Sequence, residues 1–279
     1  MTQYARTVPV LMYHHISTSP GMITVSPANF AAQMAYLAKA GYRTTGSAEF
    51  AAYLAGTPLP RNSIVITFDD GYLDNWVHAH PVLERHGFTA LCFLVTAWPG
   101  EGAPRPHAGA RESLPTLLSH KDGESAIENG EPDRVIVRWS EIDAMRRANT
   151  FEFHSHTHRH VRWDHVEPDR ARRRALLRQD LIDSRLAFDR LGGASDHLCW
   201  PQGYFDDDYR QVALEAGFRY FYTCEMGPNQ RGKALAGSTA VERSVFRLEV
   251  RDRPPGWLAS RLWVHSRPQL SRLYLKMKR

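Results

Sequence analysis

The chain has 279 residues, of which 43% are hydrophobic and 23% charged, with a formal net charge of +5. This is the composition of an ordinary soluble globular protein, and the length suits one α/β barrel-sized domain or two small ones. No window approaches the length of a membrane span, and residues 1–13 lack the apolar core of a signal peptide, so we expect a cytoplasmic protein.

The first segments alternate short apolar runs with helical patterns. Residues 8–13 predict a strand that delivers His14 and His15 to its C-terminal end. A helix over residues 26–40 follows, because apolar residues recur on one helical face and Pro27 stands in the first turn. A short strand at 42–45 and a helix at 47–54 come next.

Two adjacent carboxylates follow the most apolar strand. Residues 64–68 are Ile-Val-Ile-Thr-Phe, typical of a parallel-sheet strand that is covered on both faces. Asp69, Asp70 and Gly71 end this strand, since aspartate is depleted in strands and glycine frees the backbone to turn. Both carboxylates then lie at the C-terminal rim, where α/β folds bind ligands. Taken alone, Asp-Asp-Gly favours a solvated turn instead.

The next third contains a long loop. A helix over residues 72–87, ended by Gly87, and a strand over 88–95 precede it. Residues 98–110 are rich in proline and glycine, and residues 112–132 show no assignable pattern. A loop of this length at the same rim is a candidate wall of a substrate groove. Ser140 is predicted to cap the helix after it.

A histidine cluster follows the strand that begins at residue 151, with four histidines at positions 154, 156, 158 and 160. His156 and His160 have the spacing at which two imidazoles converge on one side of a helical turn. With one carboxylate from Asp69 or Asp70, they would form a ligand set that leaves positions open for water and substrate. A tag or a solvated loop is the alternative, but a tag is terminal, and two such signals at one rim favour a metal site.

The remaining body continues the alternation, with helices at 168–191 and 206–216 and strands at 197–200, 218–223 and 241–250. This order predicts a parallel α/β sheet and one domain over residues 1–250. Three scattered cysteines, Cys92, Cys199 and Cys224, lack the spacing of a disulfide framework. We expect reduced core thiols, which fit a reducing compartment.

Residues 251–279 form a basic tail. It has eight Lys or Arg and one acid, Asp252, so it carries +7 and leaves −2 for the body. The spacing of its apolar residues predicts one face of a helix, formed by Leu270, Leu273, Tyr274 and Met277. Such an amphipathic segment can lie on an anionic membrane surface, or it can pack on the body with its cations solvated. The body has no basic and aromatic platform that would indicate nucleic-acid binding.

Together these motifs resemble the polysaccharide deacetylase family, carbohydrate esterase family four. Its first motif, Thr-Phe-Asp-Asp-Gly, is present at 67–71, and its second, His-Ser/Thr-x-x-His, at 156–160. Its third usually reads Arg-x-Pro-Tyr/Phe-Gly and corresponds to residues 199–203, with Cys199 in place of arginine. Residues 9–15, with Met-Tyr-His, resemble the branch that includes poly-N-acetylglucosamine deacetylases. The resemblance covers roughly residues 8–250 and implies a distorted (β/α) barrel with about seven parallel strands.

The resemblance also implies a role for each motif residue. Asp70, His156 and His160 would bind a divalent metal, with zinc as the first choice and cobalt, nickel or iron as alternatives. Asp69 would be the general base.

His14 would be the general acid, and the backbone N–H of Gln202 would stabilise the oxyanion. Because Cys199 replaces the arginine that often steadies the base, Arg162 or Arg243 are the candidates to take over its role.

The implied reaction hydrolyses the acetamide of an N-acetylated amino sugar and releases acetate. The expected substrate is a bacterial glycan or a lipid-linked or lipopolysaccharide precursor, met at the cytoplasmic membrane face if the tail docks there. The alternatives are an O-deacetylase, a hydrolase of small amides, or a glycan-binding barrel that has lost catalysis. The intact pairs of aspartates and histidines argue against such a loss.

Overall fold

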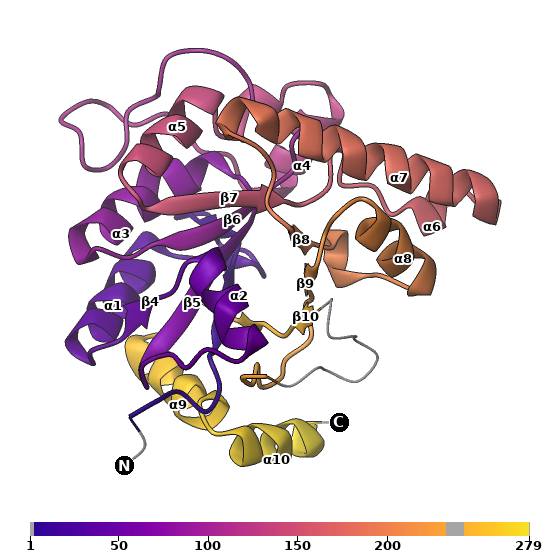
Figure 1. Cartoon of the computed structure of the whole chain (residues 1–279). Coiled ribbons are helices and arrows are strands. Elements are labelled where there is room, and N and C mark those ends of the chain that lie inside the picture. The colour runs from indigo at the N-terminus through magenta and orange to yellow at the C-terminus, as the bar shows by residue number, and fades with distance from the viewer. Residues whose placement is uncertain (1–2, 233–242, 279) are drawn as a thin grey trace.

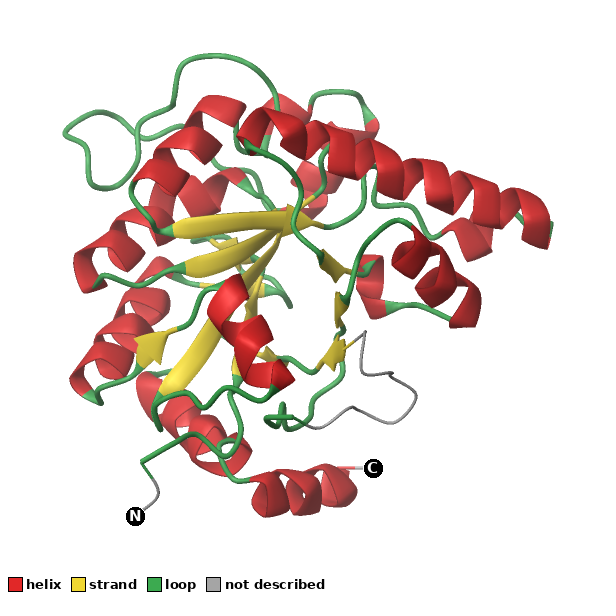
Figure 2. Cartoon of the chain, in the orientation of Figure 1, coloured by secondary structure: helices red, strands yellow, loops and turns green. Residues whose placement is uncertain are grey.

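The computed structural model describes residues 3–232 and 243–278, and its centre is a curled parallel sheet covered by helices (Figures 1 and 2). The strands are β1 Val10–Tyr13, β2 His15–Ile16, β3 Thr24–Val25, β4 Arg43–Thr44, β5 Ser63–Asp70, β6 Ala90–Leu94, β7 Phe151–Ser155, β8 His197–Cys199, β9 Tyr220–Tyr222, β10 Arg243–Val245 and β11 Leu248–Glu249. Within the described residues the main sheet has the order β10-β9-β8-β7-β6-β5-β1-β11, with β4 also beside β5. The predicted distorted barrel of parallel strands is confirmed.

Most helices lie outside this sheet, whereas the helix at Ser47–Ala55 lies across the opening of the barrel (Figure 2). Their bounds are α1 Pro27–Lys39, α2 Ser47–Ala55, α3 His80–His86, α4 His120–Glu128, α5 Trp139–Arg147, α6 Trp163–Val166, α7 Arg170–Ala187, α8 Asp207–Glu215, α9 Pro255–His265 and α10 Pro268–Lys278. Most follow the predicted pattern, because their caps are local. Ser26 caps α1, with Pro27 in its first turn, and Gly87 ends α3 with a φ of 61°.

Strand β5 is the centre of the sheet. All eight of its residues are buried, as expected for a parallel strand covered on both faces. Its register pairs Tyr13 of β1 with Phe68, and Asp70 with Leu94 of β6, which in turn pairs with Ser155 of β7. The C-terminal ends of these four strands therefore form one rim, which brings His14, Asp69 and His156 to the same edge.

The sheet curls until its two ends nearly meet. β10 pairs with β9 at one end of the strand order, and β11 pairs with β1 at the other. Only Phe246 and Arg247 separate these two strands in the chain. The sequence predicted one strand over 241–250, whereas the structure has two that are divided by this turn; residues 241–242 lie outside the described part. A two-residue connection forces the opposite edges of the sheet together.

The long loop region over residues 98–132 contains α4 and is attached to the barrel through Arg105. Arg105 Nη2 lies 2.7 Å from Glu141 Oε2, and Arg105 also donates to the carbonyl oxygens of Asp133 and Ile136. Glu141 is completely buried at the start of α5. The loop therefore has a fixed attachment to the barrel.

The predicted serine cap of α5 is wrong. The helix begins at Trp139, and Glu141 accepts a hydrogen bond of 2.7 Å from the backbone N–H of Arg138. The hydroxyl of Ser140 has no partner within the described residues. The glutamate three residues after Arg138 satisfies the helix start, so the serine is not needed for this purpose.

The basic tail forms two helices with different environments. On α9, Leu258 and Leu262 are completely buried in the main core, and α9 packs beside α1. Helix α10 packs on α9, where His265 Nδ1 lies 2.9 Å from Ser271 Oγ. The first half of the tail therefore packs as part of the body, and the predicted domain boundary at residue 250 remains a prediction.

The predicted apolar stripe of α10 is divided between two faces. Leu270 and Tyr274 are partly buried, whereas Leu273 and Met277 are 56% and 80% exposed. Arg272 is exposed on the outer face too. Among the described helices, none is long and apolar enough to cross a membrane.

Replacing Leu262 by alanine should lower the free energy of unfolding by about 2–5 kcal/mol, because a completely buried leucine leaves a cavity in the core. Urea unfolding would measure the loss. The matched control is Leu273→Ala on exposed α10, which should change stability by less than about 0.5 kcal/mol. Equal small effects would mean that α9 is not part of the folding core.

Candidate active site

A cavity of 380 Å³ opens at the C-terminal rim of the sheet. All six residues predicted for the site line it: His14, Asp69, Asp70, His156, His160 and Gln202. They come from the ends of β1, β5, β7 and β8, so the common strand direction brings them together. This position agrees with the general rule for ligand sites in parallel α/β folds.

Asp70, His156 and His160 form a compact set of ligand atoms. Asp70 Oδ1 lies 3.4 Å from His156 Nε2 and 3.5 Å from His160 Nε2. His156 Nδ1 lies 2.9 Å from the carbonyl oxygen of Cys199, so Nδ1 carries a proton and Nε2 is the nitrogen that faces Asp70. The buried Asp70 Oδ1 has no hydrogen-bond partner within the described residues. Acceptors that face one another in this way suit a cation between them.

The histidines converge through a tight turn and not through the predicted helical turn. Residues 156–162 are not helical, and Thr157 and His160 have φ angles of 65° and 59°. Ser155 Oγ accepts from the Thr157 N–H, and Thr157 Oγ1 accepts from the His160 N–H, both at 3.1 Å. Burial lowers the pKa of His160 to about 4, so its ring is neutral and able to bind a metal.

A second group, Asp69, His156 and Cys199, also has its ligand atoms close together. Burial raises the pKa of the Cys199 thiol to about 11, so the thiolate that would bind a metal is not formed at neutral pH. The Asp69 carboxylate is already paired. The geometry therefore favours Asp70, His156 and His160 as the metal set.

Asp69 is held by Arg247, which the sequence did not single out. Arg247 Nη1 lies 2.6 Å from Asp69 Oδ1, and Nη2 lies 2.9 Å from Oδ2, a bidentate pair with both side chains almost completely buried. Arg247 Nε donates to the carbonyl oxygen of Thr223 at 2.9 Å. Burial alone would raise the pKa of Asp69, but the guanidinium outweighs it and holds that pKa below its usual value.

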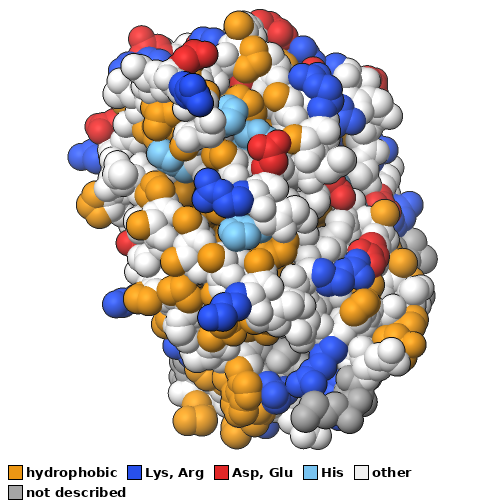
Figure 3. Space-filling model, turned by 90° about the vertical axis from the view of Figure 1, so that its left-hand side faces the viewer, with side chains coloured by type: hydrophobic (Ala, Val, Ile, Leu, Met, Phe, Trp, Pro, Cys, Tyr) orange, Lys and Arg blue, Asp and Glu red, His pale blue; other side chains and the backbone are white. Residues whose placement is uncertain are grey.

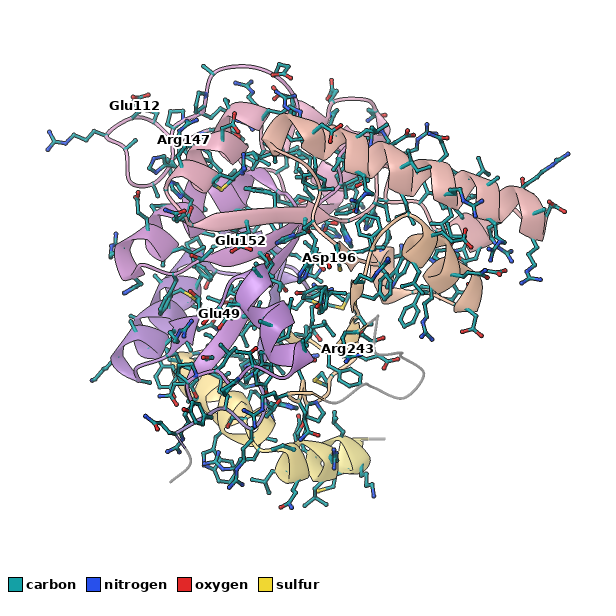
Figure 4. The ribbon with its side chains drawn as sticks, in the orientation of Figure 1. Glu49, Glu112, Arg147, Glu152, Asp196 and Arg243 are labelled. Carbon is teal, nitrogen blue, oxygen red and sulfur yellow. The ribbon has the colours of Figure 1, made fainter. Side chains whose placement is uncertain are left out.

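Neither predicted replacement for the missing arginine takes this role. Arg162 forms a bidentate pair with Asp164 at 2.7 and 2.9 Å and stacks 3.7 Å above the ring of Tyr204. Arg243, labelled in Figure 4, is the first residue of β10 and lies at the strand end away from the rim. The turn between β10 and β11 supplies the arginine instead.

His14 and His15 lie in different environments, as the strand pattern predicts. His14 lines the cavity, and its Nε2 lies 3.5 Å from Asp69 Oδ2. Burial lowers the pKa of His14. His15 is 1% exposed, bonds to Asp74 Oδ2 at 2.6 Å and stacks on Tyr72. Only His14 is therefore placed to contact a substrate.

The walls of the cavity include residues that the sequence left unassigned. His120, Glu124 and Glu128 of α4 line one side, so the long insertion does shape this cavity. Cys224 also lines it and is exposed, so the expectation of three core thiols is wrong for this residue. Cys92 and Cys199 are buried free thiols.

Backbone strain is concentrated at this rim. Of the five non-glycine residues with positive φ in the described chain, four belong to the site: Asp70, Thr157, His160 and Gln202. This conformation is uncommon for residues with a Cβ and persists where the surroundings impose it. The left-handed turn at Gln202, with φ 54°, sets the backbone of the predicted oxyanion residue at the cavity wall.

Comparison with known proteins agrees with these features. The family model described as polysaccharide deacetylase matches residues 56–221, more than half of the chain. A Bacillus subtilis polysaccharide deacetylase-type protein, YxkH, is 24% identical over 236 residues, which cover 84% of this chain and 70% of that protein. An Escherichia coli poly-β-1,6-N-acetyl-D-glucosamine N-deacetylase is 27% identical over 126 residues, which cover 45% of this chain and only 16% of that protein.

Two solved structures share the fold. IcaB from Ammonifex degensii has a TM-score of 0.69 at 22% identity, with 93% of this chain and 97% of that chain covered. The deacetylase PplD from Streptococcus pyogenes, in complex with acetate, has a TM-score of 0.68 at 19% identity, with 92% and 98% covered. The curled barrel is therefore shared over nearly the full length of these proteins.

Purified protein should bind one divalent metal per chain, and His156→Ala should abolish this binding because it removes one of three ligands. His158→Ala is the matched control, since His158 Nδ1 lies 3.0 Å from Thr96 Oγ1 and is not in the ligand set. Metal content by elemental analysis and zinc titration would measure both. A comparable loss in the two variants would contradict the assignment.

Arg247→Gln should lower the free energy of unfolding by about 3–5 kcal/mol, because it leaves the Asp69 carboxylate buried without its partner. The double variant Asp69→Asn, Arg247→Gln should regain much of this loss in urea unfolding.

The loss in Arg247→Gln should also depend on pH. In the wild-type protein the lowered pKa of Asp69 stabilises the fold above the ordinary carboxyl pKa, and this stabilisation disappears as the pH falls. In the variant, burial raises that pKa, so the fold is favoured at low pH. The difference between the two proteins should therefore shrink on acidification, and a constant difference would argue against the pairing.

Proposed function

Because the chain belongs to the polysaccharide deacetylase family, we propose that it is a metal-dependent N-deacetylase that hydrolyses the acetamide of an N-acetylated amino sugar in a glycan. One observation carries the proposal. Asp70 Oδ1 has no hydrogen-bond partner among the described residues and faces two imidazole nitrogens. Asp69, which is paired with Arg247, lies beside it at the same cavity. This arrangement offers a metal set and a separate ionised carboxylate, the two parts that amide hydrolysis by an activated water requires.

A metal bound by Asp70, His156 and His160 would supply a Lewis acid for the acetamide carbonyl and for water. The protein groups around it handle the protons. Asp69 takes a proton from the attacking water, and its carboxylate stays ionised because of Arg247. Because the pKa of Asp69 is low, the protonated carboxyl group gives this proton up readily.

His14 is placed to receive that proton. Its Nε2 lies 3.5 Å from Asp69 Oδ2, and both side chains line the same cavity. Protonated His14 then donates to the departing nitrogen, which leaves as the amine while the acetyl group leaves as acetate. The backbone N–H of Gln202 donates to the oxygen on which negative charge develops.

The substrate class follows from the cavity and from the relatives. Two tryptophans, Trp98 and Trp200, line the cavity together with the polar site residues, a combination that suits a sugar ring. Relatives are named as deacetylases of poly-N-acetylglucosamine, which supports an N-acetylglucosamine polymer over a lipid-linked or lipopolysaccharide precursor. We propose a cytoplasmic location with the basic tail at the membrane face.

Acetate release from a panel of substrates would test the function. The panel contains β-1,6- and β-1,4-linked N-acetylglucosamine oligomers, an O-acetylated glycan, a lipid-linked N-acetyl sugar and small acetamides. Release from the N-acetylglucosamine oligomers, lost on chelation and in Asp69→Asn, is the expected result. Faster release from the O-acetylated glycan would indicate an O-deacetylase, and binding without release would indicate a glycan-binding barrel.

His14→Ala should lower kcat by about a hundredfold to ten-thousandfold while metal content and thermal stability stay unchanged, because the His14 side chain lines the cavity and is not among the three ligand residues. His15→Ala is the matched control. It should lower the melting temperature, because it removes the partner of the buried Asp74. Full activity of His14→Ala on an amide substrate would refute the assignment of the acid.

A further inference from the structure

A second and larger cavity, of 670 Å³, lies at the opposite end of the barrel from the candidate active site. We call it the basal groove. It is bounded by the N-terminal segment, the end of α1, the residues before β5, and α9 with the turn that follows. Ser63 at its wall starts β5, whereas Asp69 and Asp70 end the same strand.

The charge of the basal groove is entirely positive. Arg6, Arg61 and Arg267 line it, and none of the described residues around it is acidic. Arg267 is fixed by the carbonyl oxygen of Trp263 at 2.5 Å, and its guanidinium stacks 4.5 Å above the Trp263 ring. These contacts orient the guanidinium without neutralising it, so it is prepared for an anion.

A buried hydroxyl at the same wall lacks a partner. Ser63 is 1% exposed, and its Oγ makes no hydrogen bond within the described residues. A buried polar atom that stays unpaired is unfavourable, and Ser63 also lines the groove, so a ligand that reaches this hydroxyl would satisfy it. A hydroxyl and the oriented Arg267 guanidinium together match the oxygens of a phosphate group.

The surroundings of the groove favour a membrane interface over a site for a free anion. Trp263 and Tyr4 at the groove are 56% and 51% exposed, and Leu273 and Met277 project from neighbouring α10. The lower end of the molecule in Figure 3, where α9 and α10 lie in Figure 1, shows hydrophobic and basic side chains together and no acidic ones. Exposed aromatic and aliphatic residues among arginines are typical of surfaces that enter the headgroup region of a bilayer.

We propose that the basal groove binds the phosphate of an anionic phospholipid headgroup and thereby docks this end of the protein on a membrane. Ser63 and Arg267 contact the phosphate, and the exposed side chains of Trp263 and Leu273 enter the headgroup layer. The groove is separate from the cavity at the rim, so this binding does not depend on the proposed deacetylation.

Vesicle co-sedimentation would test the proposal with the whole chain. Wild-type protein should sediment with vesicles of phosphatidylglycerol and phosphatidylcholine at physiological salt, and not with phosphatidylcholine alone. Ser63→Ala and Arg267→Lys should each weaken binding about tenfold although neither changes the charge, because each removes hydrogen bonds to the phosphate. Arg272→Lys on the outer face of α10 is the matched control and should bind like wild type.

The outcomes separate the sources of the anion. If Ser63→Ala and Arg267→Lys bind vesicles as wild type does, binding is diffuse electrostatic attraction and the groove has no part in it, which overturns the proposal. If sn-glycerol 3-phosphate raises the melting temperature of wild type while no vesicle sediments it, the groove binds a free phosphate compound, which also overturns the lipid assignment. Melting curves of each variant serve as the folding control, independent of whether the protein releases acetate.

Discussion

A buried ion pair between Arg247 and Asp69 is the interaction on which the site and the curled sheet both depend. Asp69 ends the central strand, and Arg247 occupies the two-residue turn between the strands at the two edges of the sheet. Two charges in a water-free interior are stable only when they are paired and hydrogen-bonded. The turn that joins the two edges of the sheet therefore also keeps the Asp69 carboxylate ionised. His14 and Arg247 both lie outside the matched family region, so both ends of the chain complete the site.

The parts of the fold and site that follow from local patterns could be predicted from the sequence. The apolar run of β5 followed by Asp-Asp-Gly defines a buried strand and its end. The sequence also placed His156 and His160 together, although they converge through a tight turn and not through the helical turn that their spacing suggested. Parallel strand order then brings such strand ends to one rim without further information. The alternation of helices and strands was sufficient for the parallel α/β sheet, because caps such as Ser26 and Gly87 act within a few residues. The closure of this sheet into a barrel followed only from the family resemblance.

The parts of the fold and site that depend on contacts between distant residues could not be predicted from the sequence. Arg247 is one of 35 lysines and arginines, and nothing beside it in the sequence distinguishes it from Arg162 or Arg243. Its role arises from a turn inside residues 241–250, which the sequence predicts as a single strand. The wall formed by α4 depends on the remote anchor between Arg105 and Glu141. Helical spacing gave the apolar positions of α10, but packing on α9 decided which of them face the solvent.

The length of β5 fixes how far the rim stands from the base of the barrel. Seven residue steps separate Ser63 from Asp70, which at the usual rise is about 23 Å. If the basal groove sits on a bilayer, the cavity at the rim opens away from the lipid, at a height somewhat below this strand length because strands in a barrel are tilted. The sugar unit attached directly to a lipid carrier would then be out of reach, whereas a chain of several units could bend back to the opening. The barrel would act as a spacer that selects glycans by how far they extend from the membrane.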